Sequence, residues 1–130
     1  MSRITVDLRS RTPIFEQIIN SVRKLVILGL MEPDEPMPSV RALAAELAIN
    51  PNTIQKAYAE LERQGVIYSL AGRGNFVSSD ISALKEEHNS ILLSAVAESV
   101  AQAVAYGISE SEIIAVAKAA YENNKGGNRE

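Results

Sequence analysis

Polar residues that could recognise another molecule lie close together near the middle of the chain: Asn50, Asn52, Thr53, Gln55 and Lys56. The amide side chains of asparagine and glutamine donate and accept hydrogen bonds at once, which matches the N6 and N7 edge of adenine in a DNA major groove. Lysine suits guanine or a phosphate, and threonine can contact the methyl group of thymine. Asn50 has a second interpretation, because asparagine is also a good helix N-cap. These residue types indicate a surface that reads nucleic-acid bases.

Two smaller groups of residues suit contacts to phosphates. Ser39 and Arg41 stand at the start of a predicted helix, where a hydroxyl and a guanidinium can both reach a DNA backbone. Arg73 lies between Gly72 and Gly74 in a predicted hairpin tip, which could enter a minor groove or pair with a phosphate. Each side chain also has a structural interpretation, Ser39 as a helix cap and the two arginines as solvated surface residues.

The elements that would position these residues follow from helix caps and apolar spacing. Ser39 is predicted to cap one short helix, and Asn50-Pro51 is predicted to start the next, with Gly65 at its end. Val66–Ser69 and Asn75–Ser78 are predicted as paired strands around a glycine-rich tip. A helix-turn-helix followed by a two-stranded wing is a shape that enters DNA grooves.

A longer helix is predicted before this motif. Thr12 is expected as its N-cap, Pro13 as its first residue and Gly29 as its C-terminal stop. The proline-rich segment Met31–Pro38 is then a rigid connector into the next helix.

After Ser79 the chain becomes rich in alanine, leucine and valine. Helices are predicted over residues 82–106 and 109–123, where Ser109 and Glu112 fit a capping box. Residues 124–130 are expected to be disordered. Such a hairpin, of roughly 45 residues, is too small to bury a core alone, so its apolar faces need a partner.

The domain organisation follows from this change of character. We expect a winged helix-turn-helix domain over residues 1–79 and a helical hairpin over residues 80–130. Two hairpins from two copies of the chain could form a four-helix arrangement, which predicts a homodimer.

Composition narrows the classes of function. The chain has no cysteine, which excludes disulfides and thiolate metal sites, and its single histidine, His88, has no ligand cluster around it. No catalytic motif is present, so we expect no enzyme, no metal and no cofactor. No apolar stretch is long enough to cross a membrane, and the N-terminus lacks the apolar core of a signal peptide. A cytoplasmic location without membrane contact is therefore expected.

The net charge of −3 does not exclude a DNA partner. Basic and acidic residues balance over residues 1–80, and residues 81–130 carry the whole negative excess. The windows 47–59 and 64–79 contain no acidic residue but include Lys56 and Arg73. The sign of the local charge, rather than the net charge of the chain, decides whether a surface can enter a DNA groove. The acidic net charge predicts only modest non-specific affinity for DNA.

Residues 12–77 resemble the GntR family of bacterial transcription regulators. The likeness lies in the TPIFEQI start, the PSVRALAAEL helix, the NPNTIQKAYAELERQG helix and the GRGNFV wing. The short helical tail is similar to that of the YtrA-like subgroup. The resemblance implies homodimers that bind operator DNA, usually as repressors, and the subgroup is commonly associated with ABC transporter operons.

The resemblance also assigns roles to residues. It implies that Arg41 contacts the DNA backbone and that Gly72, with Arg73 beside it, approaches the minor groove. It places the recognition-helix contacts at Asn50, Pro51, Asn52, Thr53 and Gln55. The chain departs from the family pattern twice: Pro33-Asp34 replaces a common Pro-Gly, where Asp tolerates left-handed geometry, and Pro51 stands where other members can have arginine.

Together these observations predict a mainly α protein with a small β-wing, built from a winged helix-turn-helix domain and a C-terminal two-helix dimerisation hairpin. The predicted function is that of a homodimeric repressor that binds a palindromic operator in double-stranded DNA. A winged helix used for protein docking, without sequence-specific DNA binding, is the alternative. A hydrophobic crevice between the hairpins could take a small-molecule effector of unknown identity.

Overall fold

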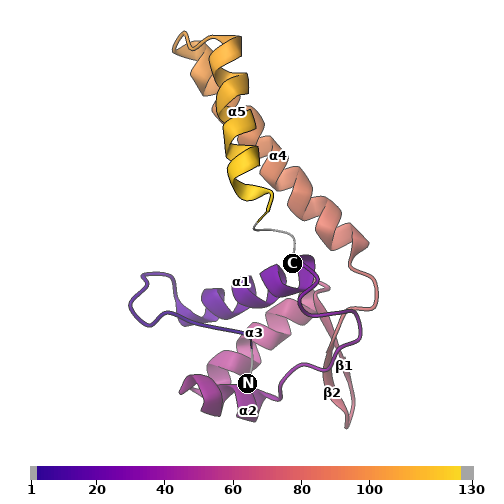
Figure 1. Cartoon of the computed structure of the whole chain (residues 1–130). Helices are drawn as coiled ribbons and strands as arrows, with labels where there is room; N and C mark the ends of the chain where they lie inside the picture. Colours follow the sequence, from indigo (N-terminus) through magenta and orange to yellow (C-terminus); the bar gives the residue numbers. More distant parts are fainter. Residues whose placement is uncertain (1–2, 127–130) are drawn as a thin grey trace. The chain divides into compact units, whose positions relative to one another are not determined.

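The computed structural model describes residues 3–126 of the chain. It contains five helices and one two-stranded antiparallel sheet within those residues (Figure 1). The fold is therefore mainly α with a small sheet, as predicted. By internal contacts the chain divides into a first compact unit that ends at Glu86 and a second that begins at Glu87. In chain order the elements are α1 (Ile14–Ile27), α2 (Val40–Leu47), α3 (Pro51–Arg63), β1 (Ile67–Leu70), β2 (Gly74–Val77), α4 (Ser82–Ala105) and α5 (Glu110–Asn124).

Helix α1 starts one residue later than its sequence indicates. Pro13 is the N-cap, with an extended ψ of 145°, and no side chain caps the helix, so the prediction of Thr12 as N-cap was wrong. Because Pro13 is extended, Thr12 lies one residue outside the helix, and the Gln17 side-chain amide donates to the backbone oxygens of Thr12 at 2.8 Å and Asp7 at 3.1 Å. The predicted stop at Gly29 is confirmed, with φ of 79°.

The segment before α1 packs along the first unit without forming a strand. Ile4 is buried in the hydrophobic core at 1% exposure. The Arg3 guanidinium donates to the backbone oxygen of Leu30 and pairs with the Glu35 carboxylate. These contacts tie the start of the chain to the far end of α1 and to the connector that follows it.

Helices α2 and α3 form the predicted helix-turn-helix. Ser39 Oγ accepts a hydrogen bond from the Ala42 amide at 3.0 Å, which confirms the predicted cap. The turn passes through Ala48 in the left-handed conformation, with φ of 56°. The Asn50 side chain then caps α3, accepting from the Asn52 amide at 2.8 Å. The helices close over one core whose buried members include Ile18, Val22, Val26, Leu43, Ile54, Leu61, Val66 and Val77.

Tyr58 fixes the recognition-helix candidate α3 to the start of α2. Its ring is buried, at 2% exposure, and its hydroxyl donates to the backbone oxygen of Pro38 at 2.7 Å. Burial raises the pKa of the Tyr58 phenol, so the group stays neutral and donates throughout the physiological range.

Replacing Tyr58 by Phe should therefore lower the free energy of unfolding by about 1–2 kcal/mol, because the Pro38 carbonyl loses its partner while the ring packing is kept. Urea denaturation of the two proteins measures this difference. An unchanged midpoint and slope would show that the hydrogen bond contributes nothing net.

The wing strands pair as the predicted strands imply, Ile67 with Val77 and Leu70 with Gly74, and each strand lies one residue nearer the tip than predicted. The connector lies against β2 and bonds to its backbone. Val77 donates to the backbone oxygen of Glu35 at 2.9 Å, and Met37 donates to that of Asn75 at 2.8 Å. The predicted rigid connector thus forms part of the wing's support.

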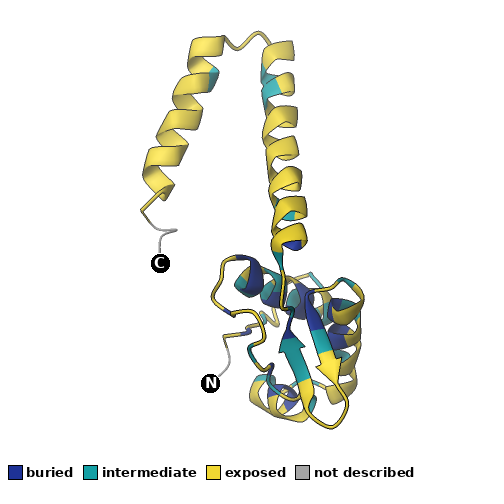
Figure 2. Ribbon diagram, turned by 90° about the vertical axis from the view of Figure 1, so that its right-hand side faces the viewer, coloured by how far each residue is buried: buried dark blue, intermediate teal, exposed yellow. Residues whose placement is uncertain are grey.

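The second unit is a pair of helices with little core of its own. The α4 and α5 residues of this unit are almost entirely exposed (Figure 2). Gly107, with φ of 85°, makes the turn, and Ser109 Oγ caps α5 by accepting from the Glu112 amide at 3.2 Å. The expected disorder concerns residues 124–130, of which 127–130 lie outside the described residues, whereas Asn124 is the last residue of α5.

Candidate nucleic-acid interface

One face of α3 carries the polar residues that the sequence predicts to read bases. Asn52, Gln55 and Lys56 are exposed, and positions three and four apart share one helix face. The opposite face is buried through Ile54 and Leu61. Because the helix is anchored on its apolar side, its first two turns present amides and an ammonium group to solvent.

Thr53 and Asn50 are less available to a partner than Asn52, Gln55 and Lys56. The Thr53 side chain is half-buried, and its backbone amide donates to the Asn50 carbonyl at 3.0 Å. The Asn50 side-chain oxygen is engaged in the helix cap with Asn52. Pro51 has no amide hydrogen, so the first turn of α3 offers side chains rather than backbone donors to a partner.

Helix α2 adds a second set of groups. Arg41 lies in its first turn and is exposed, while Ser39 is exposed but uses its hydroxyl oxygen as the helix cap. A capping hydroxyl keeps its own hydrogen, so Ser39 can still donate to a phosphate oxygen. The structural interpretation of Ser39 is confirmed, and a phosphate contact is compatible with it.

The wing tip presents Arg73 on a tight turn. The Arg73 amide donates to the Leu70 carbonyl at 2.9 Å, and Gly72, at the third position of this turn, has φ of 76°. A positive φ at that position is typical of a type II turn and favours glycine. Nothing lies within 4 Å of the place where a Cβ atom on Gly72 would be, so the tip is open to an approaching backbone.

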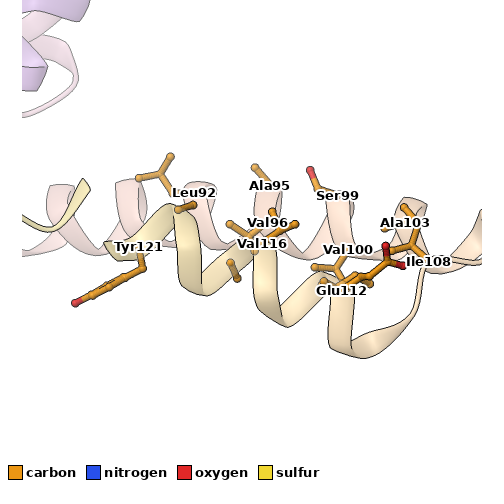
Figure 3. A pocket seen from close by; sticks show the side chains of 13 residues that line it. Leu92, Ala95, Val96, Ser99, Val100, Ala103, Ile108, Glu112, Val116 and Tyr121 are labelled. Atoms are coloured by element: carbon orange, nitrogen blue, oxygen red, sulfur yellow. The ribbon is translucent and has the colours of Figure 1, made fainter. Parts of the chain in front are cut away.

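A separate feature of the second unit is an apolar groove of about 880 Å³ between α4 and α5 (Figure 3). Its lining recurs at helical spacing on both helices. Val96 and Val100 face it from α4, Val116 from α5, and Glu112 places a carboxylate at one end. Further large apolar residues lie exposed outside the groove: Ile91, Leu93, Val104 and Ile114.

Other kinds of site find no support in the part of the chain that the structure describes. Residues 3–126 contain no group of three or more His, Cys, Asp or Glu side chains that could hold a metal ion. No helix among them is both long and apolar enough to cross a lipid bilayer.

Sequence reasoning missed the contacts that hold the wing. The Asp34 carboxylate accepts from Tyr68 on β1, and Glu62 on α3 accepts from Ser69 Oγ. Asp34 adopts the left-handed conformation that the sequence allows, with φ of 66°. The partners of its side chain, Tyr68 and Ser79, lie 34 and 45 positions away in the chain. No local sequence pattern predicts such contacts, because they depend on how the elements pack.

Residues 14–77 match the sequence model of the family described as bacterial regulatory proteins, gntR family. The HTH-type transcriptional repressor YtrA of Bacillus subtilis (strain 168) is 51% identical over 77 residues. The aligned region covers 59% of this chain and 59% of that repressor, so the likeness spans less than two thirds of its length.

Solved structures extend the likeness. A transcriptional regulator from Oenococcus oeni matches with a TM-score of 0.75 and 27% identity over 88% of this chain and 95% of that chain. YtrA from Sulfolobus acidocaldarius, a GntR-family transcription factor, matches with a TM-score of 0.58 and 34% identity over 74% and 99%. AraR(DBD) in complex with operator ORX1 matches with a TM-score of 0.54 and 25% identity over 60% and 100%. These relatives are transcription regulators rather than enzymes.

Proposed function

Because the chain belongs to the GntR family of bacterial regulatory proteins, we propose that it is a sequence-specific DNA-binding repressor that acts as a homodimer in the cytoplasm. The observation that carries the proposal is the exposed polar face at the start of α3, held on a helix-turn-helix and flanked by a wing with an arginine at its tip. The operator complex of the AraR domain supports DNA as the partner.

The proposed contacts divide into base readout and backbone positioning. Asn52, Gln55, Lys56 and the half-buried Thr53 would read base edges in the major groove, with Asn50 chiefly as the cap that orients them. Other residues would fix the register on the duplex through phosphates or the minor groove: Ser39, Arg41, Gly72 and Arg73.

The second unit is proposed as the dimerisation module. The expected division into residues 1–79 and 80–130 would then separate the DNA-binding domain from this module. Apolar residues lie both inside the α4–α5 groove and outside it, and a helix that is apolar on several sides is normally buried. A second copy of the hairpin would supply that cover and form a four-helix arrangement. Recognition helices about 34 Å apart would then meet successive major grooves of a palindromic operator.

Arg41→Ala should weaken binding to every DNA sequence by a similar factor, because an interaction with a phosphate carries no base information. The slope of log affinity against log salt concentration should become shallower by about 0.9 for each phosphate that the variant no longer neutralises. Fluorescence anisotropy over a salt series measures both effects. Arg63→Ala is the matched control, since it removes the same charge from a guanidinium that is paired with Glu60. Equal slopes for Arg41→Ala and the unmodified protein would remove Arg41 from the interface.

The function itself is tested by selection from a random duplex library, followed by sequencing of the bound fraction. The proposal expects an enriched palindromic sequence, and its genomic position would identify the regulated operon. The resemblance to the YtrA-like subgroup supports a nearby ABC transporter operon as the target. A bound fraction without any enriched sequence would contradict specific DNA binding and favour the protein-docking alternative.

A further inference from the structure

Asp34 combines an uncommon backbone conformation with an unusual set of contacts. Among the described residues only Asp34 and Ala48 have a positive φ without being glycine, at 66° and 56°. The left-handed conformation is unfavourable for residues with a Cβ atom, although Asp is among those that adopt it most readily. A glycine at position 34 would adopt the same turn at no steric cost.

What the aspartate adds is a carboxylate that links three segments. Its Oδ1 atom accepts hydrogen bonds from Tyr68 Oη at 2.8 Å and from Ser79 Oγ at 2.6 Å. The backbone amide of Asp34 donates to the carbonyl of Val77 at 2.9 Å. One residue of the connector thus holds β1, the end of β2 and the segment that follows β2.

The protonation states of Asp34 and Tyr68 agree with the direction of this hydrogen bond. The two hydroxyl donors hold the pKa of the Asp34 carboxyl below its ordinary value, with Ser79 contributing more than Tyr68. The same contact raises the pKa of the Tyr68 phenol. The carboxylate is therefore ionised, and Tyr68 remains a donor, at neutral pH.

The opposite face of β1 is held by helix α3. Successive strand residues point to opposite faces, so Tyr68 and Ser69 leave β1 in opposite directions. Ser69 Oγ donates to Glu62 of α3 at 2.9 Å. The Tyr68 ring also lies over Phe76 of β2, with 5.5 Å between ring centroids. The base of the wing is thereby fixed to α3 on one side and to the connector on the other.

We propose that Asp34 is a positioning residue for DNA binding, because it fixes the base of the wing and so sets the place of Arg73 relative to α3. The inference rests on the proposed function. Tyr68 precedes Leu70, which opens the tip turn, by only two residues. If Tyr68 became mobile, the tip turn would therefore become mobile as well. Arg73 would then no longer be held in one position for its proposed minor-groove contact.

Asp34→Gly is the decisive variant, because it removes the carboxylate while relieving the backbone. A residue of merely structural value would lower stability when removed. Here the free energy of unfolding should change little, because relief of the left-handed backbone offsets the lost hydrogen bonds, while operator affinity falls about three- to tenfold, because the loosened wing must be ordered on binding. Glu87→Gln controls for the loss of one negative charge, which by itself would favour DNA binding.

A double-mutant cycle tells whether the effect passes through the wing tip. In an Arg73→Ala background, Asp34→Gly should change operator affinity no further, whereas in an Asn52→Ala background its full effect should remain. Tyr68→Phe should reproduce the loss of affinity seen with Asp34→Gly. Full additivity with Arg73→Ala, or unchanged affinity of Asp34→Gly, would overturn the assignment.

Hydrogen exchange without DNA separates this inference from the proposed function. The Arg73 amide, which closes the tip turn, should exchange faster in Asp34→Gly than in the unmodified protein, while the α3 amides keep their protection. This result is expected even if no operator exists. Equal exchange of the Arg73 amide in both proteins would show that Asp34 does not restrain the wing.

Discussion

Replacing Val116 by Glu is expected to convert the proposed dimer into a monomer and to weaken operator binding about 10²- to 10⁴-fold. Two linked DNA-binding domains bind a palindrome with an avidity that exceeds either half by such a factor, and a monomer loses all of it. Val116 is 69% exposed in the single chain and lines the α4–α5 groove (Figure 3). The glutamate thus costs the isolated hairpin little, but a buried unpaired carboxylate would oppose the four-helix arrangement.

The matched control is Ala115→Glu, which introduces the same charge one position earlier on α5, where the side chain does not line the groove. Sedimentation velocity gives the mass of each variant, and fluorescence anisotropy gives its operator affinity. A Val116→Glu protein that remains a dimer with full affinity would contradict the proposed dimer interface. A retained dimer with reduced affinity would show that Val116 affects operator binding by a route other than dimerisation.

The double replacement Asn52→Ala, Gln55→Ala should remove most of the preference for the operator over scrambled DNA. Each good base contact is worth about 1–3 kcal/mol of discrimination, so the two together account for roughly 2–6 kcal/mol if they act independently. Both side chains are exposed on α3, while its apolar face holds the helix in the core. Folding should therefore be unaffected, and affinity for scrambled DNA should change little.

Anisotropy measurements on operator and scrambled duplexes, at one salt concentration, give the discrimination directly. Asn89→Ala, which removes an exposed amide from α4, is expected to leave the preference intact. If the double variant discriminated as well as the unmodified protein, base readout would have to be reassigned to other residues.

Local chemistry explains why much of the fold could be predicted from the sequence. The caps at Ser39, Asn50 and Ser109 each depend on a side chain two or three positions from its partner, so their signals survive in a short window. The same is true of Gly29 and Gly107, which end helices with a positive φ.

Features that depend on distant residues were not predictable in this way. The extended backbone of Pro13 leaves Thr12 outside α1, and Gln17 holds that loop through the carbonyl groups of Thr12 and Asp7. The connector forms backbone hydrogen bonds to β2 through Glu35 and Met37, and no local sequence pattern indicates these contacts. Asp34 could be assigned a left-handed backbone but not its partners, because Tyr68 and Ser79 reach it only after the wing has folded.

In the candidate site, too, some features could be predicted from nearby residues and others could not. Residue type and position at a helix start were enough to select the polar face of α3, and the structure places Gln55 and Lys56 on an exposed face of that helix. Periodicity alone could not show that Thr53 is half-buried or that the first-turn amides are already engaged. Those facts leave side chains, rather than backbone amides, as the groups of α3 proposed to read bases.

The most direct test of sequence-specific DNA recognition is fluorescence anisotropy with the selected operator and a scrambled duplex of the same length and composition, each at about 50 and about 200 mM salt. We expect tight operator binding, affinity for both duplexes that falls steeply with salt, and a preference of at least about 10³-fold that persists at the higher concentration. Equal weak binding to both duplexes at both concentrations would contradict sequence-specific recognition.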